Sequence, residues 1–296
     1  MNGRLSHRNP CHTFYLIMVY MTIEKTDSHT HTWFSGHGSG TVDEVVRAAL
    51  SQGMTMVALT EHLPLPPEVD PDGGFGMTPS QVDEYFAQLH EARLAYPNIE
   101  IISGVELDWR YGAEEYLLGW LERYPFELVL GSVHMLTYPS GEHWEFDHPD
   151  FADGWDVRNE EGVWREYFDL WMQAITSKVP FDLMAHPDLP KKLGHKPTFD
   201  TTEYYRAMAE AAARAGVMVE VNTSGLHKTV GELYPAPALL SDFCRAGVPC
   251  TLSSDAHAPK HVGRSFDAGY AALAAAGYTH ITAPTRSGDR REIPLS

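Results

Sequence analysis

Cysteine and positive charge are both scarce in this sequence, and each shortage excludes a class of protein. The cysteines among the 296 residues are Cys11, Cys244 and Cys250. Their odd number and wide spacing argue against a disulfide framework or a thiolate zinc site and favour a reducing, cytoplasmic location. Lysine and arginine total 22 against 40 acidic residues, which gives a net charge of −18. Because such a surface repels phosphate backbones, we do not expect nucleic acid as a partner.

The sequence also lacks an apolar run of membrane-spanning length. The stretch 14–21 (FYLIMVYM) has eight residues, whereas a spanning helix needs about 20, so we expect no membrane partner. No small-residue cleavage site follows this stretch, which disfavours a secretory signal. We interpret residues 1–21 as an N-terminal extension, or as the product of a mis-assigned start with Met18 or Met21 as the true one. Residues 22–296 then form the folded domain.

The rest of the chain alternates between short apolar runs and amphipathic patterns. Segments rich in Val, Ile and Leu predict seven strands, at 22–29, 54–61, 99–107, 126–134, 181–186, 217–223 and 249–255. Patterns with the helical period predict helices at 41–52, from Thr78 onward, at 160–177, at 201–215 and at 264–276. This alternation predicts an α/β fold with a parallel sheet and helical crossovers.

No linker divides the chain, so we expect a single domain. The economical arrangement is a closed α/β barrel of the TIM type with seven or eight strands, and a doubly wound open sheet is the alternative. Two segments, 64–78 and 136–159, are long enough to be functional loops. The tail, 284–296, is typical of irregular chain or of a short hairpin.

Almost every predicted strand ends in a potential metal ligand. In a parallel barrel these ends meet on one face, where barrel enzymes have their active sites. Residues i and i+2 of a strand point the same way, so His29 and His31 can share an ion, as can Asp255 and His257. The polar groups at the strand ends are, in chain order, Asp27, His29, His31 and nearby His37; Glu61 and His62; Glu106 and Asp108; His134; His186 and Asp188; Glu220 and Asn222; and Asp255 and His257.

Crowding so many polar groups costs several kcal/mol per buried charge unless cations compensate. We therefore predict a site for several metal ions. Imidazole and carboxylate ligands without thiolate suit Zn, Mn or Fe, and several ions close together favour hydrolytic chemistry. Histidines away from the strand ends are expected to be ordinary loop residues, namely His90, His143, His148, His195 and His280.

The motifs HxH, TEH, GxE, GSVH, AHPD and SDAH follow one another between about Thr22 and Ala283. In these motifs and their order the chain resembles the polymerase-and-histidinol-phosphatase (PHP) family. Longer strings such as DSHTHTWFSGHGSG, VALTEHLPLP and SSDAHAPKHVG are most similar to its monofunctional histidinol-phosphate phosphatases. The resemblance implies a distorted TIM-like (β/α)7 barrel that holds three divalent ions.

The resemblance also implies a reaction and a ligand set. The reaction is hydrolysis of L-histidinol phosphate, a small phosphorylated substrate, to L-histidinol and phosphate in histidine biosynthesis. Glu106 would bridge two ions, and Asp255 or His257 would help to move the proton. The implied ligands of the three ions are His29, His31, Glu106 and Asp255; His37, His62 and His257; and Glu106, His134 and His186.

Basic side chains should also bind the substrate phosphate, because cationic donors match its oxygens. Lys191 and Lys192 are equally well explained as a solvated surface pair. Relatives commonly carry Arg where His227 stands, so this chain departs from the family there. The candidates that follow predicted strands five to seven are Lys191, Lys192, His227, Lys228 and Arg264.

Three other functions are compatible with parts of this pattern. A PHP-type phosphoesterase could act on another small phosphate ester or on a nucleotide. A metal-binding protein with a decayed site would be expected to have lost some ligand positions, yet all nine are present. A metal-dependent amidohydrolase usually needs a carboxylated lysine at a strand end, and no predicted strand ends in Lys.

Overall fold

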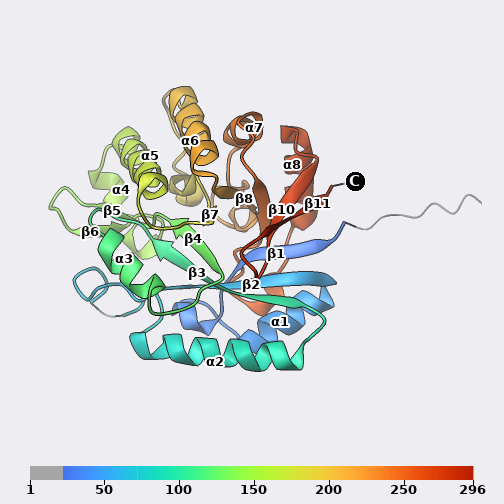
Figure 1. Cartoon of the computed structure of the whole chain (residues 1–296). Helices are drawn as coiled ribbons and strands as arrows, with labels where there is room; N and C mark the ends of the chain where they lie inside the picture. Colours follow the sequence, from blue (N-terminus) through green and yellow to red (C-terminus); the bar gives the residue numbers. More distant parts are fainter. Residues whose placement is uncertain (1–22, 72, 296) are drawn as a thin grey trace, which may run out of the picture.

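The computed structural model describes residues 23–71 and 73–295, so the extension expected at 1–21 lies outside the described residues. Seven strands form one parallel sheet (Figure 1). The sheet curls until its last strand meets its first, where an isolated parallel bridge joins Thr30 to Ala256. The amide of Asp255 also donates to the carbonyl of His29 over 2.9 Å. The predicted α/β barrel of seven strands is confirmed, and the open-sheet alternative is wrong.

All seven predicted strands are present. Parallel strands in a barrel are covered on both faces, which explains why they appear in the sequence as continuous apolar runs. Their order around the barrel is β1-β2-β3-β4-β7-β8-β9. The bounds are β1 Lys25–Thr30, β2 Met54–His62, β3 Glu100–Asp108, β4 Leu128–Ser132, β7 Leu183–Met184, β8 Met218–Asn222 and β9 Cys250–Ser253.

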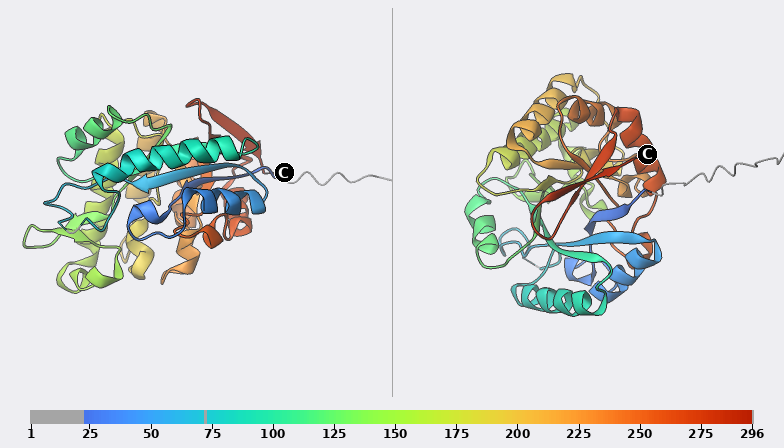
Figure 2. Two further views of the ribbon diagram at one scale, coloured as in Figure 1. Left: turned by 90° about the horizontal axis from the view of Figure 1, so that it is seen from below. Right: turned by 45° about the vertical axis from the view of Figure 1, so that its right-hand side comes forward.

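The helices pack around the outside of the barrel (Figure 2). The first helix begins with a capping box, in which the amide of Glu44 donates to Thr41 Oγ1 and Glu44 Oε2 accepts from the amide of Thr41. Five helices match the predictions: α1 Val42–Ser51, α2 Pro79–Ala95, α5 Glu160–Thr176, α6 Thr202–Ala215 and α8 Phe266–Ala276. Three that the periodicity did not predict are short: α3 Glu114–Leu121, α4 Gly154–Val157 and α7 Pro237–Arg245.

The segment 136–159, predicted as a loop, carries structure of its own. Strands β5 (Met135–Thr137) and β6 (His143–Glu145) form an antiparallel hairpin, and α4 follows it. Two tryptophans hold the segment together, since Trp144 Nε1 donates to the carbonyl of Phe151 and Trp155 Nε1 to that of Phe146. These aromatic anchors give a polar segment enough buried surface to hold a defined shape.

The tail was predicted to be irregular chain or a short hairpin over 284–296. It forms a hairpin, which begins at His280. Strands β10 (His280–Pro284) and β11 (Arg290–Pro294) pair in antiparallel fashion. The amide of Arg286 donates to Glu100 at the start of β3, and Arg291 lies 2.9 Å from Glu24 just before β1. The hairpin therefore covers the amino end of the barrel, opposite the polar strand ends.

Two further findings concern the cysteines and the helices. Cys244 and Cys250 are free thiols, while Cys11 lies outside the described residues. Among the helices of residues 23–71 and 73–295, none combines the length and the apolar character needed to cross a membrane.

Candidate metal centre

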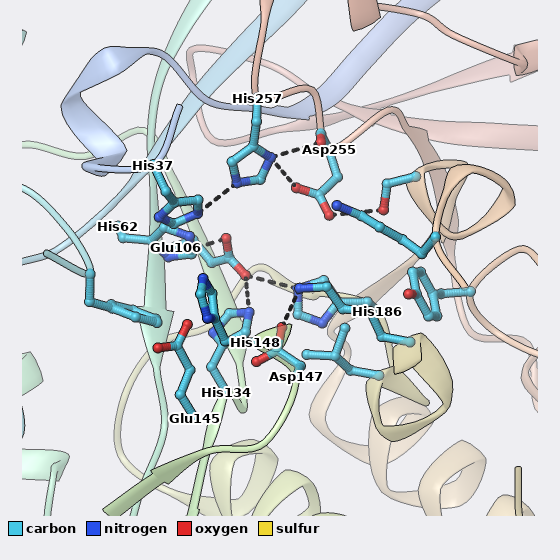
Figure 3. Close-up of a pocket in the computed structure, with 16 residues that line it drawn as sticks. His37, His62, Glu106, His134, Glu145, Asp147, His148, His186, Asp255 and His257 are labelled. Atoms are coloured by element: carbon cyan, nitrogen blue, oxygen red, sulfur yellow. Dashed lines mark hydrogen bonds and ion pairs between the residues drawn. The ribbon is translucent and has the colours of Figure 1, made fainter. Parts of the chain in front are cut away.

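The carboxyl ends of the seven strands meet around Glu106, a β3 residue that is 1% exposed. Its Oε2 atom lies 3.0 Å from His29 Nε2 and 3.3 Å from His31 Nε2. Its Oε1 atom faces the other way and lies 3.0 Å from His186 Nε2 and 3.6 Å from His134 Nε2 (Figure 3). The two oxygens of one carboxylate thus face two separate groups of histidines.

A second carboxylate, Asp255, lies beside the two β1 histidines. Its Oδ1 atom is 3.4 Å from His31 Nε2 and 3.7 Å from His29 Nε2. The Nε2 atoms of these histidines are 2.9 Å apart, so the rings point at one place, as expected for residues i and i+2 of a strand. Asp255 has a φ of 48°, in the left-handed region, at the turn that follows β9.

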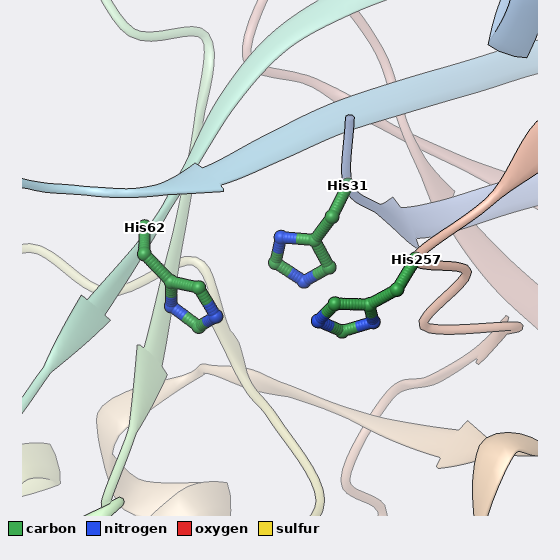
Figure 4. Close-up of side chains that lie close together, drawn as sticks. All are labelled: His31, His62 and His257. Carbon is green, nitrogen blue, oxygen red and sulfur yellow. The ribbon is translucent and has the colours of Figure 1, made fainter. Parts of the chain in front are cut away.

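Further histidines form the outer part of the cluster. His31, His62 and His257 have ligand atoms within 4.8 Å of one another, and their rings surround a common space (Figure 4). His37, which is exposed, places its Nε2 atom 2.9 Å from His257 Nε2. The structure therefore brings all nine predicted ligand residues into one cluster.

The donor set fits divalent cations. Buried carboxylate charges are costly without compensating cations. The Nδ1 atom of His62 has no hydrogen-bond partner among the described residues, and it lies 3.5 Å from Glu106 Oε2. Cations among these nitrogens and oxygens would satisfy both, and imidazole with carboxylate is a ligand set for divalent transition metals.

Burial raises the pKa of a carboxyl group and lowers the pKa of an imidazole, because it disfavours the charged form of each. It raises the pKa of Glu106, but the neighbouring His62 and His29 outweigh it and hold that pKa well below its usual range. At Asp255 burial is likewise outweighed by His29, and the pKa again lies well below its usual value. Burial lowers the pKa of His62 and of His257 well below the usual value. The two carboxylates are thus held in the ionised form and these two imidazoles in the neutral form, which are the forms that bind metal. Burial also lowers the pKa of His29, but the carboxylates around it outweigh burial and raise that pKa well above its usual value, so a metal ion there would displace a proton.

A cavity of about 180 Å³ opens onto the cluster. Phe75 contributes to its wall from the first loop predicted to be functional, and Glu145, Asp147 and His148 contribute from the second. His148 accepts the amide of Asp150, as expected of an ordinary loop histidine, and its side chain borders the cavity. A larger cavity of about 490 Å³ adjoins the first and shares Phe75, Glu145 and His148 with it.

Four of the five basic candidates line cavities at this end of the barrel. Lys192 and Lys228 line the cavity that opens onto the cluster. His227 and Arg264 line a neighbouring cavity of about 160 Å³, which also includes Lys228. The two lysines are therefore the candidates that share a cavity with Glu106.

The fifth candidate, Lys191, does not line either cavity. Its Nζ atom lies 2.7 Å from Asp188 Oδ2 and donates to the carbonyl of Leu233, and the side chain is 2% exposed. Lys192 is instead 2.6 Å from Asp147 Oδ2. Consecutive residues of the 3-10 turn after β7 point in different directions, so Lys191 and Lys192 are not a solvated surface pair.

Methionine substitutions should separate the roles of these two lysines. Lys191→Met leaves the buried Asp188 without its cation, and removing one partner of a buried ion pair costs about 3–5 kcal/mol. We expect a fall of that order in the unfolding free energy measured by denaturant titration, with little change in phosphate binding. Lys192→Met should cost less stability, because its amine is partly exposed, but should weaken the binding of inorganic phosphate measured by calorimetry. The reverse pattern would contradict both assignments.

Among the strand-end acids that lie behind the ligands are Glu220, Glu61 and Asp27. Glu220 accepts from His29 Nδ1 over 3.1 Å, and Glu61 accepts from Ser35 Oγ over 2.5 Å. Asp27 accepts the amide of Ser254 and helps to hold the turn after β9. The polarity of the strand ends marked all three in the sequence, but strand periodicity does not distinguish a ligand from a residue that supports one.

The chain is similar to several known proteins. The PHP domain family model matches residues 27–224. A protein of Deinococcus radiodurans named probable histidinol-phosphatase is 35% identical over 242 residues, which cover 81% of this chain and 89% of that protein. The histidinol-phosphatase of Bacillus subtilis is 27% identical over 270 residues, which cover 83% of this chain and 98% of that protein.

A solved structure has the same fold. It is the histidinol phosphate phosphatase of Lactococcus lactis in complex with zinc, L-histidinol and phosphate, at a TM-score of 0.71 and 21% identity. The similarity covers 90% of this chain and 98% of that one. The family match spans more than half of the sequence and includes six of the seven barrel strands, β1 apart from its first two residues. This chain belongs to the PHP domain family.

Proposed function

We propose that this chain is a metal-dependent phosphomonoesterase that hydrolyses L-histidinol phosphate to L-histidinol and phosphate, a step of histidine biosynthesis. The observation that carries the proposal is the position of Glu106, whose two oxygens face two groups of histidines at the base of a small cavity. Relatives named histidinol-phosphatase support the substrate, and the Lactococcus lactis structure holds L-histidinol and phosphate.

The centre is proposed to hold three ions of Zn, Mn or Fe. Groups suited to an ion are His29 with His31 and Asp255, His31 with His62 and His257, and His62 with Glu106 and His134. The first of these groups lies entirely within the first proposed ligand set. The second group shares His62 and His257 with the second set, and the third group shares Glu106 and His134 with the third set. The proposed sets are His29, His31, Glu106 and Asp255; His37, His62 and His257; and Glu106, His134 and His186.

The chemistry is divided between the ions and the side chains. Divalent ions, when bound, supply activation of a water nucleophile and neutralisation of the phosphate oxygens. Lys192 and Lys228 are proposed to bind the outer phosphate oxygens from the cavity wall. Proton transfer is assigned to the pair formed by Asp255 and His257, whose Oδ1 and Nδ1 atoms are 3.4 Å apart.

The acidic side of the cavity supports a cationic leaving group. Glu145 and Asp147 lie across the cavity from His257 (Figure 3), and the adjoining larger cavity adds Asp70 and Asp150. Burial, together with Asp147, raises the pKa of Glu145 to about 7, which an incoming cation would reverse. The ammonium and imidazole of histidinol complement such a wall, whereas the further phosphates of a nucleoside diphosphate or triphosphate would be repelled.

Phosphate release from a panel of phosphomonoesters tests the proposal. Histidinol phosphate should exceed phosphoserine, phosphoethanolamine and nucleoside monophosphates in kcat/KM by about 10²-fold or more, because a site built to bind polar groups discriminates strongly against substrates that lack them. Glu145→Gln should reduce this preference more than it reduces the rate on p-nitrophenyl phosphate. Equal rates across the panel would contradict the substrate and would favour an enzyme for other small phosphate esters.

A further inference from the structure

Strand β8 ends in polar residues that belong to none of the proposed ligand sets. Its register places it between β7 and β9, with Met184 opposite Val219 and Asn222 opposite Ser253. We propose that β8 is the positioning strand of the metal centre, in which Glu220 fixes the tautomer of His29 and, with Asn222, holds the ligands of both neighbouring strands in place. The inference rests on the proposed metal centre but not on the identity of the substrate.

The contact between Glu220 and His29 determines which nitrogen of the ring faces the cluster. Both side chains are fully buried, and His29 Nδ1 lies 3.1 Å from Glu220 Oε2 and 3.3 Å from Oε1. An ionised carboxylate can only accept, so Nδ1 must carry the proton. That leaves Nε2, which faces Glu106, Asp255 and His31, as the nitrogen available to a metal ion.

The same carboxylate holds a ligand from β7. The backbone amide of His186 donates to Glu220 Oε1 over 2.9 Å, and His186 has a φ of 24°. A non-glycine residue rarely adopts such a value and keeps it only where its surroundings hold it there. Glu220 therefore fixes the direction from which the His186 ring reaches Glu106.

Asn222 extends the network to the ligand that follows β9. Its Nδ2 donates to Glu220 Oε1 over 2.8 Å and to Asp255 Oδ2 over 3.2 Å. Ser224 Oγ donates to the same Asp255 oxygen over 3.1 Å, which leaves Oδ1 directed at the β1 histidines. Since Asp255 also has a left-handed backbone, this network keeps a second strained ligand in position.

Glu220 is a positioning residue and not a ligand itself. Its Oε1 atom accepts from His186 and Asn222, and its Oε2 atom accepts from His29. A related arrangement serves the other β1 histidine, because His31 Nδ1 lies 2.9 Å from Ser35 Oγ, which donates to the buried Glu61. Both histidines of the HxH motif are thus oriented by a buried acid, directly in one case and through a hydroxyl in the other.

The Glu220→Gln variant tests the proposal through metal affinity. Glutamine keeps one oxygen for His186 and Asn222 but presents an amide N–H where His29 Nδ1–H needs an acceptor, so the His29 tautomer should change. We expect zinc affinity, measured by competition with a chromophoric chelator, to fall by about 10- to 100-fold for one ion. Excess zinc should restore activity. Glu220→Asp, which keeps an acceptor, should lose less affinity.

A matched control is Glu127→Gln at the amino end of the barrel. Glu127 is partly buried, pairs with Arg93 and accepts the amide of Ser103, so its loss should lower the Tm without changing zinc affinity. Equal losses of zinc affinity in both variants would reduce Glu220 to a general structural role. Full zinc affinity in Glu220→Gln would overturn the proposal.

The tautomer can also be measured in the unmodified protein, which keeps the test decisive should Glu220→Gln not fold. Nitrogen-15 NMR of the histidine rings in metal-loaded protein should show His29 protonated at Nδ1 and unprotonated at Nε2, with His29→Gln supplying the assignment. Protonation at Nε2 would overturn the proposal. Failure of the unmodified protein to bind any zinc would instead contradict the metal centre on which the proposed function rests.

Discussion

Glu106→Gln is expected to lose bound metal and phosphatase activity together. Its two carboxylate oxygens face different histidine groups, and an amide offers only one oxygen and no charge. Metal ions contribute several kcal/mol of transition-state stabilisation, so their loss should reduce kcat/KM by about 10³-fold or more. Elemental analysis and phosphate release, measured on the same preparation, provide the two readouts.

Glu91→Gln is a suitable control, because it makes the same change at an exposed position of α2 and should retain both metal and activity. Circular dichroism should show that the Glu106 variant is still folded. Full metal content with a full rate would contradict the bridging role of Glu106. Full metal content with a lost rate would make Glu106 a catalytic base instead of a ligand.

The fold was predictable because a parallel barrel has a strong periodic signal. Seven apolar runs separated by helical patterns correspond to the seven strands of the sheet. The helices that were not predicted, such as α3 (Glu114–Leu121) and α7 (Pro237–Arg245), have eight and nine residues. A helix of about two turns repeats the helical period only a few times, so it is hard to recognise from the sequence alone.

The positions of the ligand residues were predictable for a related reason. Residues at strand ends are brought together by the topology alone, so His29 and Asp255, more than 200 positions apart in the sequence, meet once the barrel closes. The direction of a side chain in an irregular segment carries no such constraint. Lys191 and Lys192 are adjacent in sequence, yet one pairs with Asp188 and the other lines the cavity. The hairpin that carries Glu145 is likewise set by buried tryptophans.

Removal of the ions by a chelator is expected to abolish phosphate release and to lower the Tm. An ion that binds only the folded state adds about 4 kcal/mol of stability when its free concentration is about 1,000 times Kd. For a chain of this size, a loss of about 1 kcal/mol lowers the Tm by about 2 °C. Each ion should therefore account for about 8 °C in thermal unfolding followed by circular dichroism. An unchanged Tm after complete removal would contradict a metal centre built into the fold.

The ions should not leave together. The proposed set of His37, His62 and His257 contains only imidazoles, and His37 is exposed, whereas the other two sets share the buried charge of Glu106. An ion bound only by neutral imidazoles, one of them exposed, should dissociate more easily than an ion bound by a buried carboxylate. Graded chelation should therefore remove one equivalent of metal first and the remaining two equivalents in a single later step. His37→Ala should bind two equivalents with nearly full affinity. A fully active protein that contains only two equivalents of metal would contradict the count of three, because activity would then not require an ion in each of the three proposed sets.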